Sequence, residues 1–381
     1  MRDDRPRPRR RGRRHRGRAR RLTLVLALAA ALVAAAAARA APLTVLAYYY
    51  PWFAPDGARW HAGYVRAGVD PPLLGEYVSS DPAVVDRHFA WAHEYGIGAF
   101  VCSWDGAGSF SDRTLAGSLF PSPARGSTQL AVLYESLARF PLGGDARIHL
   151  DADGVARLVG DFDYLARTYF SEPGYLRVDG RPVVVIYASR IFRGPFAEAI
   201  AAIRADVESV TGVDPYLIGD EVDWDNPPDP ARIGLFDAIT GYTPYSRTQA
   251  ATLTGAAFLA AVRERTALFA AVARSEGVAF VPDAIPGYDD LGERPAEAHH
   301  VLPRELGGDP AGLFSGELAQ ASGLVDRRLG LLAVTSFDEW GEDTQIEPTA
   351  GYGTTFLERL RDFATRWDTA PLPRGAPPVA R

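Results

Sequence analysis

The chain has 381 residues and a formal net charge of −6, but the charges are unevenly distributed along it. Residues 1–21 carry twelve arginines, and the part of the chain after residue 40 has 28 basic and 45 acidic residues, a net charge of about −17. Nucleic-acid binding needs clustered Lys and Arg, so the acidic excess after residue 40 argues against a nucleic-acid partner for that part of the chain. The one cysteine, Cys102, excludes an internal disulfide, and its apolar surroundings predict a buried small side chain.

The first forty residues are predicted to be a targeting segment. An apolar run from Leu22 to Ala38 follows the arginines and ends in Ala38-Arg39-Ala40. A basic region, an apolar region and an A-x-A site are typical of a secretory signal peptide. An uncleaved membrane anchor is the alternative, because the run is about the minimum length for crossing a bilayer. Both interpretations predict an exported protein, either secreted or held at the membrane.

Residues 41–369 are predicted to form one catalytic domain, which a Pro-rich tail over 370–381 follows. Short apolar or β-branched runs alternate with helical periodicity throughout this region. Such near-continuous apolar runs are expected of parallel strands that are buried on both faces. The runs predict eight strands: Leu43–Tyr49, Gly98–Trp104, Gln129–Tyr134, Pro182–Ala188, Pro215–Gly219, Phe236–Thr240, Ala279–Ile285 and Leu331–Phe337.

The helical patterns between these runs have recognisable ends. The clearest begins with Asp81 as N-cap and Pro82 in the first turn, and Gly96 closes it. Eightfold alternation of strand and helix predicts an α/β fold, a closed (β/α)₈ TIM barrel, with an open doubly wound sheet as the alternative. Further helices are predicted over Gly154–Phe170, Pro195–Val210, Gln249–Ser275, Leu313–Arg328 and Thr355–Trp367.

Polar and aromatic residues follow the C-terminal ends of the predicted strands, where barrel enzymes carry their chemistry. Carboxylates among aromatic rings suit a sugar, whose C–H faces stack on rings and whose hydroxyls bond to acids. We therefore expect the protein to act on an oligosaccharide or polysaccharide. We also expect it to be a monomer. The residues are Tyr49, Tyr50, Trp104, Asp105, Glu135, Tyr187, Asp220, Glu221, Tyr242, Tyr245, Asp283, Glu339 and Glu342.

Glu339 and Glu342 stand three residues apart after the last predicted strand. Glycoside cleavage needs one group that protonates the leaving oxygen and another that acts at the sugar. Solvated loop carboxylates or ion-pair partners are the alternative, but the neighbouring Trp340 and the position after a strand favour a catalytic pair. Trp340 itself is expected to contact the substrate. Asp338 and Asp343 would raise the pKa of their neighbours by like-charge repulsion. Glu347, further along the segment, is predicted to be structural.

Other polar residues give weaker signals. His61 lies on the long first loop, where it either reaches substrate or is an ordinary loop residue. His299-His300 lacks the spacing of a metal-binding helix motif, and we expect neither a metal nor an organic cofactor. A calcium-binding loop is conceivable in one acidic segment, but its prolines favour a turn-rich surface loop; the acidic residues are Asp223, Asp225 and Asp229.

Four segments together resemble glycoside hydrolase family 99, the endo-α-mannosidase and endo-α-mannanase family. They are Tyr49–Trp52, Leu74–Pro82, Gly96–Trp104 and Thr335–Pro348, within a resemblance that spans roughly residues 43–367. The last segment is the specific one, since the family reads Ser-Phe-Asn-Glu-Trp-His-Glu-Gly-Thr-Gln-Ile-Glu-Pro there. This chain has Asp338 in place of Asn, Gly341 in place of His and Asp343 in place of Gly.

The resemblance implies roles for individual residues. Glu339 matches the family's general base, which deprotonates the 2-hydroxyl of the substrate so that a 1,2-anhydro sugar forms and the configuration is retained. Glu342 matches the general acid. The resemblance further implies substrate contacts for Glu135, for Trp104 as a stacking residue, and for Tyr49, Tyr50 and Tyr242. Two alternatives remain open on the same barrel: a glycan-binding protein that does not hydrolyse, and a polysaccharide-biosynthesis protein.

Overall fold

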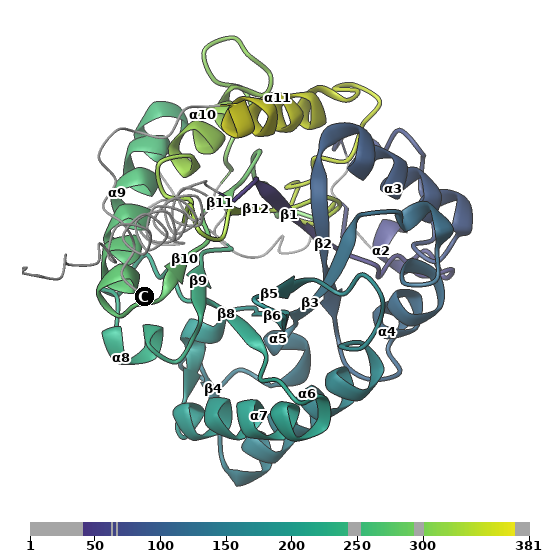
Figure 1. Cartoon of the computed structure of the whole chain (residues 1–381). Coiled ribbons are helices and arrows are strands. Elements are labelled where there is room, and N and C mark those ends of the chain that lie inside the picture. Colours follow the sequence, from purple (N-terminus) through teal and green to yellow (C-terminus); the bar gives the residue numbers. More distant parts are fainter. Residues whose placement is uncertain (1–40, 62–63, 66–67, 243–252, 293–300, 370–381) are drawn as a thin grey trace, which may run out of the picture. The chain divides into compact units, whose positions relative to one another are not determined.

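Parallel strands form a closed ring in the computed structural model, which describes residues 41–61, 64–65, 68–242, 253–292 and 301–369 (Figure 1). The strand order is β10-β9-β8-β6-β3-β2-β1-β12-β11, and every neighbouring pair is parallel. The bounds are β1 Thr44–Tyr49, β2 Ile97–Trp104, β3 Gln129–Tyr134, β6 Arg181–Ile186, β8 Tyr216–Asp220, β9 Ala238–Thr240, β10 Ala279–Phe280, β11 Asp283–Ala284 and β12 Leu331–Val334.

The ring closes through the seventh predicted strand, which the structure divides into β10 and β11. β10 pairs with β9, and β11 pairs with β12. Val281 and Pro282 lie between the two parts: the Val281 N–H donates to Ile239 O at 2.9 Å, and Pro282 O accepts from the Ala333 N–H at 2.8 Å. The first part of this strand is therefore hydrogen-bonded to β9 and the second part to β12, so the sheet closes on itself. The predicted closed barrel is confirmed, and the alternative of an open sheet is not.

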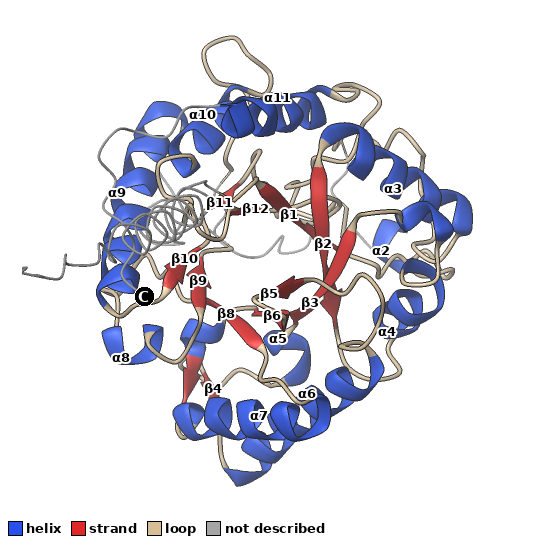
Figure 2. Cartoon of the chain, viewed as in Figure 1, coloured by secondary structure: helices blue, strands red, loops and turns tan. Residues whose placement is uncertain are grey.

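Helices surround the ring (Figure 2). The long ones are α3 Pro82–Tyr95, α6 Ala152–Thr168, α7 Phe196–Thr211, α9 Gly255–Ser275, α10 Gly312–Ala321 and α11 Thr355–Thr369. Asp81 accepts from the Ala83 N–H at 2.8 Å and Gly96 has φ 81°, so both predicted ends of α3 are confirmed. α10 ends well before the predicted Arg328, and the start of the predicted helix at 249–252 lies outside the described residues.

Short elements complete the connections. The short helices are α2 Ala58–His61, α4 Phe110–Thr114, α5 Ser136–Arg139 and α8 Pro230–Ile233, and single turns span Leu115–Leu119, Pro123–Arg125 and Ser189–Ile191. The minor strands are β4 Ile148–His149, β5 Arg177–Val178 and β7 Phe192–Arg193; β4 pairs with β7, and β5 is antiparallel to β6.

Side chains alternate along the strands between two apolar layers. On β1, Leu46 and Tyr48 belong to a cluster made almost entirely of strand residues, which fills the barrel. Val45 and Tyr49 belong to the larger cluster that also contains residues of the surrounding helices. Cys102 is buried in this outer layer and forms no disulfide, as predicted. The alternation decides which residues at the strand ends can face the interior.

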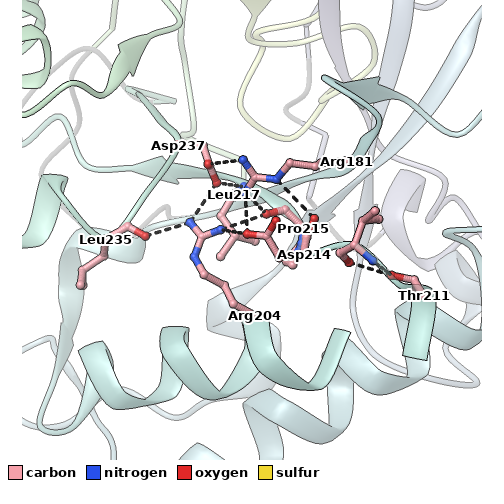
Figure 3. A network of polar contacts seen from close by, with 9 residues as sticks. Arg181, Arg204, Thr211, Asp214, Pro215, Leu217, Leu235 and Asp237 are labelled. Atoms are coloured by element: carbon pink, nitrogen blue, oxygen red, sulfur yellow. Dashed lines mark hydrogen bonds and ion pairs between the residues drawn. The ribbon is translucent and has the colours of Figure 1, made fainter. Parts of the chain in front are cut away.

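An ion-pair network braces the N-terminal ends of three strands (Figure 3). Asp237, directly before β9, accepts from Arg181 at 2.6 Å, from Arg204 of α7 at 2.9 Å and from the Leu217 N–H at 2.9 Å. Both arginines also bond Asp214. Residues at this end of a barrel serve stability, whereas the opposite end carries the chemistry. Among the helices described, none is long and apolar enough to cross a membrane.

Candidate active site

The segment after β12 forms a loop whose two ends are tied together. The Ser336 N–H donates to Thr344 O at 2.9 Å, and the Ile346 N–H donates to Ser336 O at 3.0 Å. The Phe337 N–H continues the pairing with β1 by donating to Tyr48 O at 2.7 Å. Residues 338–343, which include both predicted catalytic glutamates, are therefore held by backbone bonds at the C-terminal end of the barrel.

Glu339 is fixed at both its backbone and its carboxylate. Its N–H donates to Ser336 Oγ at 2.8 Å, and its Oε1 accepts from the hydroxyl of Tyr64 at 2.6 Å and from the Gly341 N–H at 2.8 Å. Only 2% of its surface is exposed. Two donors on one oxygen fix the orientation of the carboxylate.

Glu342 lies in the same electrostatic neighbourhood as the other predicted site residues. Its backbone carbonyl accepts from the Asp289 N–H at 2.8 Å, and 7% of its surface is exposed. Burial is the largest cause that raises the pKa of Tyr187, and the charge of Glu342 is the second largest. The charge of Glu342 also raises the pKa of Tyr50 and of Tyr242. The structure therefore brings Glu342 together with residues that follow β1, β6 and β9.

Glu135, directly after β3, is the third carboxylate of the site. Its Oε1 accepts from Ser103 Oγ at 2.8 Å. Burial first, and the nearby charge of Asp105 second, raise the pKa of Glu135 to about 8, and Glu342 adds to the effect. At neutral pH Glu135 is thus mostly protonated, and a protonated carboxyl can donate a hydrogen bond to a sugar oxygen.

Tyr50 and Tyr242 face each other inside the barrel. Their hydroxyls are hydrogen-bonded to one another, and both side chains belong to the interior cluster. The Tyr50 N–H donates to Asp338 at 2.7 Å, and the Tyr242 N–H donates to Asp220 at 3.1 Å. Burial raises the pKa of both phenols well above the ordinary value, so they stay neutral hydrogen-bonding groups beside the glutamates.

Glu347 anchors the loop from behind. Its carboxylate accepts from the hydroxyl of Tyr77 at 2.8 Å and from Trp340 Nε1 at 3.0 Å, and it lies 3.1 Å from His88 Nε2. The hydroxyl of Tyr49 lies 3.0 Å from the other ring nitrogen of His88. Glu347 itself is 1% exposed. Its predicted structural role is confirmed, and it connects the loop to α3.

Comparison with known proteins agrees with this geometry. Residues 55–364 match the family model of Glycosyl hydrolase family 99. The chain belongs to this family. Uncharacterized protein WxcX of Xanthomonas campestris pv. campestris is 25% identical in an alignment 363 residues long, which covers 85% of this chain and 50% of that protein. The chain thus spans about half the length of this curated relative.

Solved structures show the same fold. The family 99 endo-alpha-mannosidase from Bacteroides thetaiotaomicron superposes with a TM-score of 0.65 at 19% identity, over 85% of this chain and 97% of that one. A GH5_18 protein from Streptomyces cattleya gives a TM-score of 0.54 at 12% identity, over 88% and 83% of the two chains. The barrel is therefore shared beyond family 99.

Three predicted substrate contacts are corrected by the structure. Tyr49, Trp104 and Trp340 are all 0% exposed. Tyr49 and Trp104 point to the layer of helices, where Trp104 Nε1 donates to Asp112 at 2.8 Å. Trp340 bonds Glu347, as described above. The rings of Tyr49 and Trp104 present no open face to a sugar, because neighbouring strand residues point to opposite sides of the sheet. The Trp340 ring is enclosed in a buried cluster with Phe53, Trp60 and Tyr77.

Other predictions outside the loop have mixed outcomes. The exposed His61 side chain lies 3.3 Å from Glu76, an ordinary surface pair. Asp223 accepts from two backbone N–H groups of its own turn, and Asp229 caps α8, so the turn-rich loop is confirmed. No cluster of three metal-binding side chains occurs among the described residues. Tyr245 and His299-His300 lie outside them.

Two residues that depart from the family 99 motif have defined surroundings. Asp338 is completely buried and accepts from the Tyr50 N–H, and burial first, with the charge of Glu347 second, raises its pKa well above the ordinary value. Asp343 has φ 50°, a left-handed conformation that suits glycine, and bonds Arg304 at 2.9 Å. The charge of Asp338 raises the pKa of Tyr49 and Tyr77, and the predicted effect of Asp338 and Asp343 on the two glutamates stays a prediction.

The sequence did not single out Tyr64, which lies beside Glu339, or Arg59, which lies beside the Tyr64 ring. Tyr64 donates to the Glu339 carboxylate, and Arg59 places its guanidinium carbon 3.7 Å from the ring centre of Trp52 and 4.8 Å from that of Tyr64. Both come from the connection between β1 and α3. This connection has neither a helical nor a strand period, so no pattern in it could have predicted which side chains turn inward.

Proposed function

We propose that this family 99 chain is a retaining, endo-acting glycoside hydrolase that cleaves α-mannosidic or related glycan linkages. The observation that carries the proposal is the geometry of the loop after β12: Tyr64 and the loop's Gly341 N–H donate to the Glu339 carboxylate, and Glu342 acts electrostatically on Glu135, Tyr50 and Tyr242. Membership of family 99 supports a carbohydrate substrate.

In the first step, Glu339 acts as general base and takes the proton of the sugar's 2-hydroxyl. The freed oxygen attacks the anomeric carbon as the bond to the leaving oxygen breaks, and Glu342 gives its proton to that leaving oxygen. The product is a 1,2-anhydro sugar together with the released alcohol. The configuration at the anomeric carbon is inverted once.

In the second step, a water molecule opens the three-membered ring. Glu342, now a carboxylate, takes a proton from the water, and the water oxygen bonds to the anomeric carbon. The 2-oxygen of the sugar, released from the three-membered ring, then recovers its proton from Glu339. The second inversion restores the original configuration, both glutamates return to their starting protonation states, and no glycosyl-enzyme bond forms.

The mannoside preference rests on resemblance, since the similar Bacteroides structure is described as an endo-alpha-mannosidase. We expect shorter oligosaccharides to appear when the protein is incubated with α-mannans and related α-glycans, with mass spectrometry as the measurement. Affinity for such glycans without any cleavage across the panel would contradict hydrolysis. That outcome would favour a glycan-binding protein on the same barrel.

Glu135 should make substrate affinity depend on pH. Because its pKa is about 8, the protonated form that donates to a sugar is present below pH 8 and is lost above it. In a Glu339→Gln background, which binds without turnover, we expect affinity to fall as pH rises from 7 to 9. In the double variant Glu135→Gln/Glu339→Gln, the amide still donates, and the affinity should stay constant. Calorimetric titration measures both, and parallel pH profiles would contradict this role.

We also propose that the protein acts outside the cytoplasm. The support is the arginine-rich and apolar character of residues 1–40. Fractionation of expressing cells, followed by N-terminal sequencing, should find the mature chain outside the cytoplasm and beginning near Ala41. A full-length chain in the cytoplasmic fraction would contradict export, whereas a full-length chain in the membrane fraction would favour the anchor.

A further inference from the structure

A tyrosine from a distant part of the sequence reaches the proposed general base. Tyr64 and Glu339 are 275 positions apart, and the phenol donates to Glu339 Oε1 at 2.6 Å. The same oxygen accepts from the Gly341 N–H at 2.8 Å. The phenol and the backbone therefore hold the carboxylate from two directions, and only the phenol can be removed by a substitution that leaves the loop intact.

The contact depends on the absence of a side chain at position 341. A Cβ on Gly341 would stand 2.3 Å from Cζ and 2.5 Å from Cε1 of the Tyr64 ring. Carbon atoms that are not bonded pack at about 3.5 Å or more, so any larger residue would displace the ring. The family motif has His where this chain has Gly341. The contact between Tyr64 and Glu339 therefore requires glycine at position 341.

The Tyr64 ring has its own support. It meets the ring of Trp52 edge to face, with ring centres 6.0 Å apart at 87°. The guanidinium of Arg59 lies near both rings, 4.8 Å from the centre of Tyr64 and 3.7 Å from that of Trp52. Cation–π contacts of this kind fix the ring in place while leaving its hydroxyl directed at the carboxylate.

We propose that Tyr64 is a positioning residue for Glu339: it reaches in from the β1–α3 connection and occupies the space that Gly341 leaves open, where the family motif carries a histidine. The inference rests on the proposed function, which makes Glu339 the general base. A phenol that donates to a carboxylate favours the ionised form and fixes its orientation, and both effects assist proton abstraction.

Other ionisable groups surround Glu339 and have to be kept constant in a test. Tyr50 from the end of β1 and Tyr242 from the end of β9 both interact with its charge. Glu342 belongs to the same loop, and the charge of Glu135 also acts on Tyr50. Arg59 stands behind the Tyr64 ring. Tyr64→Phe changes none of these groups and keeps the ring that packs against Trp52 and Arg59.

The pH dependence of kcat/KM tests the proposal. Tyr64→Phe should move the acid limb of the profile upward by about one pH unit, because one such hydrogen bond to a charged group corresponds to about that shift. Gly341→Ala should have a similar effect by displacing the ring, and the double variant should add little further. Tyr352→Phe, which removes a phenol from a half-exposed ring outside the site, should leave the limb unchanged.

A second readout does not need turnover. Carbon-13 NMR of protein labelled at the glutamate carboxyls, with the Glu339 signal assigned by its loss in Glu339→Gln, follows the titration of this group directly. Tyr64→Phe should raise the pKa of Glu339 by about one unit. If the pKa of Glu339 is the same in Tyr64→Phe as in the wild type, the proposal is overturned even if the enzyme is active. If the titration moves but no glycan is cleaved, the contact is supported and the proposed function fails.

Discussion

Glu339→Gln is expected to lower kcat/KM for glycan hydrolysis by about 10³-fold or more, since a positioned general base contributes about 10²–10⁴-fold. The amide has the shape of the carboxylate and can still accept from Tyr64 and the Gly341 N–H, but it cannot take a proton from the substrate. The measurement is initial rate against substrate concentration, with circular dichroism as a check on folding.

Glu342→Gln provides the matched comparison within the same loop. Its loss should be about as large for a natural linkage, because the leaving oxygen then departs without a proton. With an oligosaccharyl fluoride, whose leaving group needs no proton, the loss should be clearly smaller for Glu342→Gln than for Glu339→Gln. Glu172→Gln, an exposed glutamate before β5, is the control and should match the wild type. Wild-type rates in both loop variants would rule out the assignment.

The second large effect is expected in stability. Glu347→Ala leaves the Tyr77 hydroxyl, Trp340 Nε1 and the ring of His88 without their shared buried partner. Buried donors that lose their acceptor cost about 1–3 kcal/mol each, and breaking a buried pair costs about 3–5 kcal/mol. We expect the free energy of unfolding to fall by about 4 kcal/mol, as measured by denaturant titration.

Two comparisons separate this effect from a general loss of charge. Glu347→Gln keeps an acceptor oxygen and should lose less stability than Glu347→Ala. Glu94→Ala, on the exposed face of α3, should change the free energy of unfolding by about 0.5 kcal/mol or less. If Glu347→Ala unfolds at the same denaturant concentration as Glu94→Ala, then Glu347 does not anchor the loop as described.

The sequence predicted the barrel because its signals are periodic. Apolar runs and capped helices repeat with regular spacing, and the boundaries of Gln129–Tyr134 agree with the structure to the residue. The break in the seventh strand was missed, although Pro282 has no N–H to donate and so marks a point where pairing changes. Side-chain direction was also missed. These strands are apolar on both faces, so alternation could not show that Tyr49 points outward and Tyr50 inward.

The candidate site was predicted in its carboxylates and only partly in its surroundings. Glu339 and Glu342 follow a strand directly, and the barrel fixes where such residues lie. Tyr64 is different, because an irregular connection brings it to Glu339 and no local pattern records that contact. The glycine at position 341 was visible as a departure from the family motif. The sequence does not show that the Tyr64 ring occupies the space a side chain at this position would take.

The most direct test of the account is the anomeric configuration of the first product. A defined α-linked manno-oligosaccharide that the protein cleaves should be followed by proton NMR from the first minutes, before the released reducing end equilibrates. The two-step mechanism predicts that the α-anomer forms first and that Glu339→Gln gives no detectable product over the same minutes. A β-anomer formed first, or cleavage that persists in Glu339→Gln, would contradict the two-step mechanism through the 2-hydroxyl.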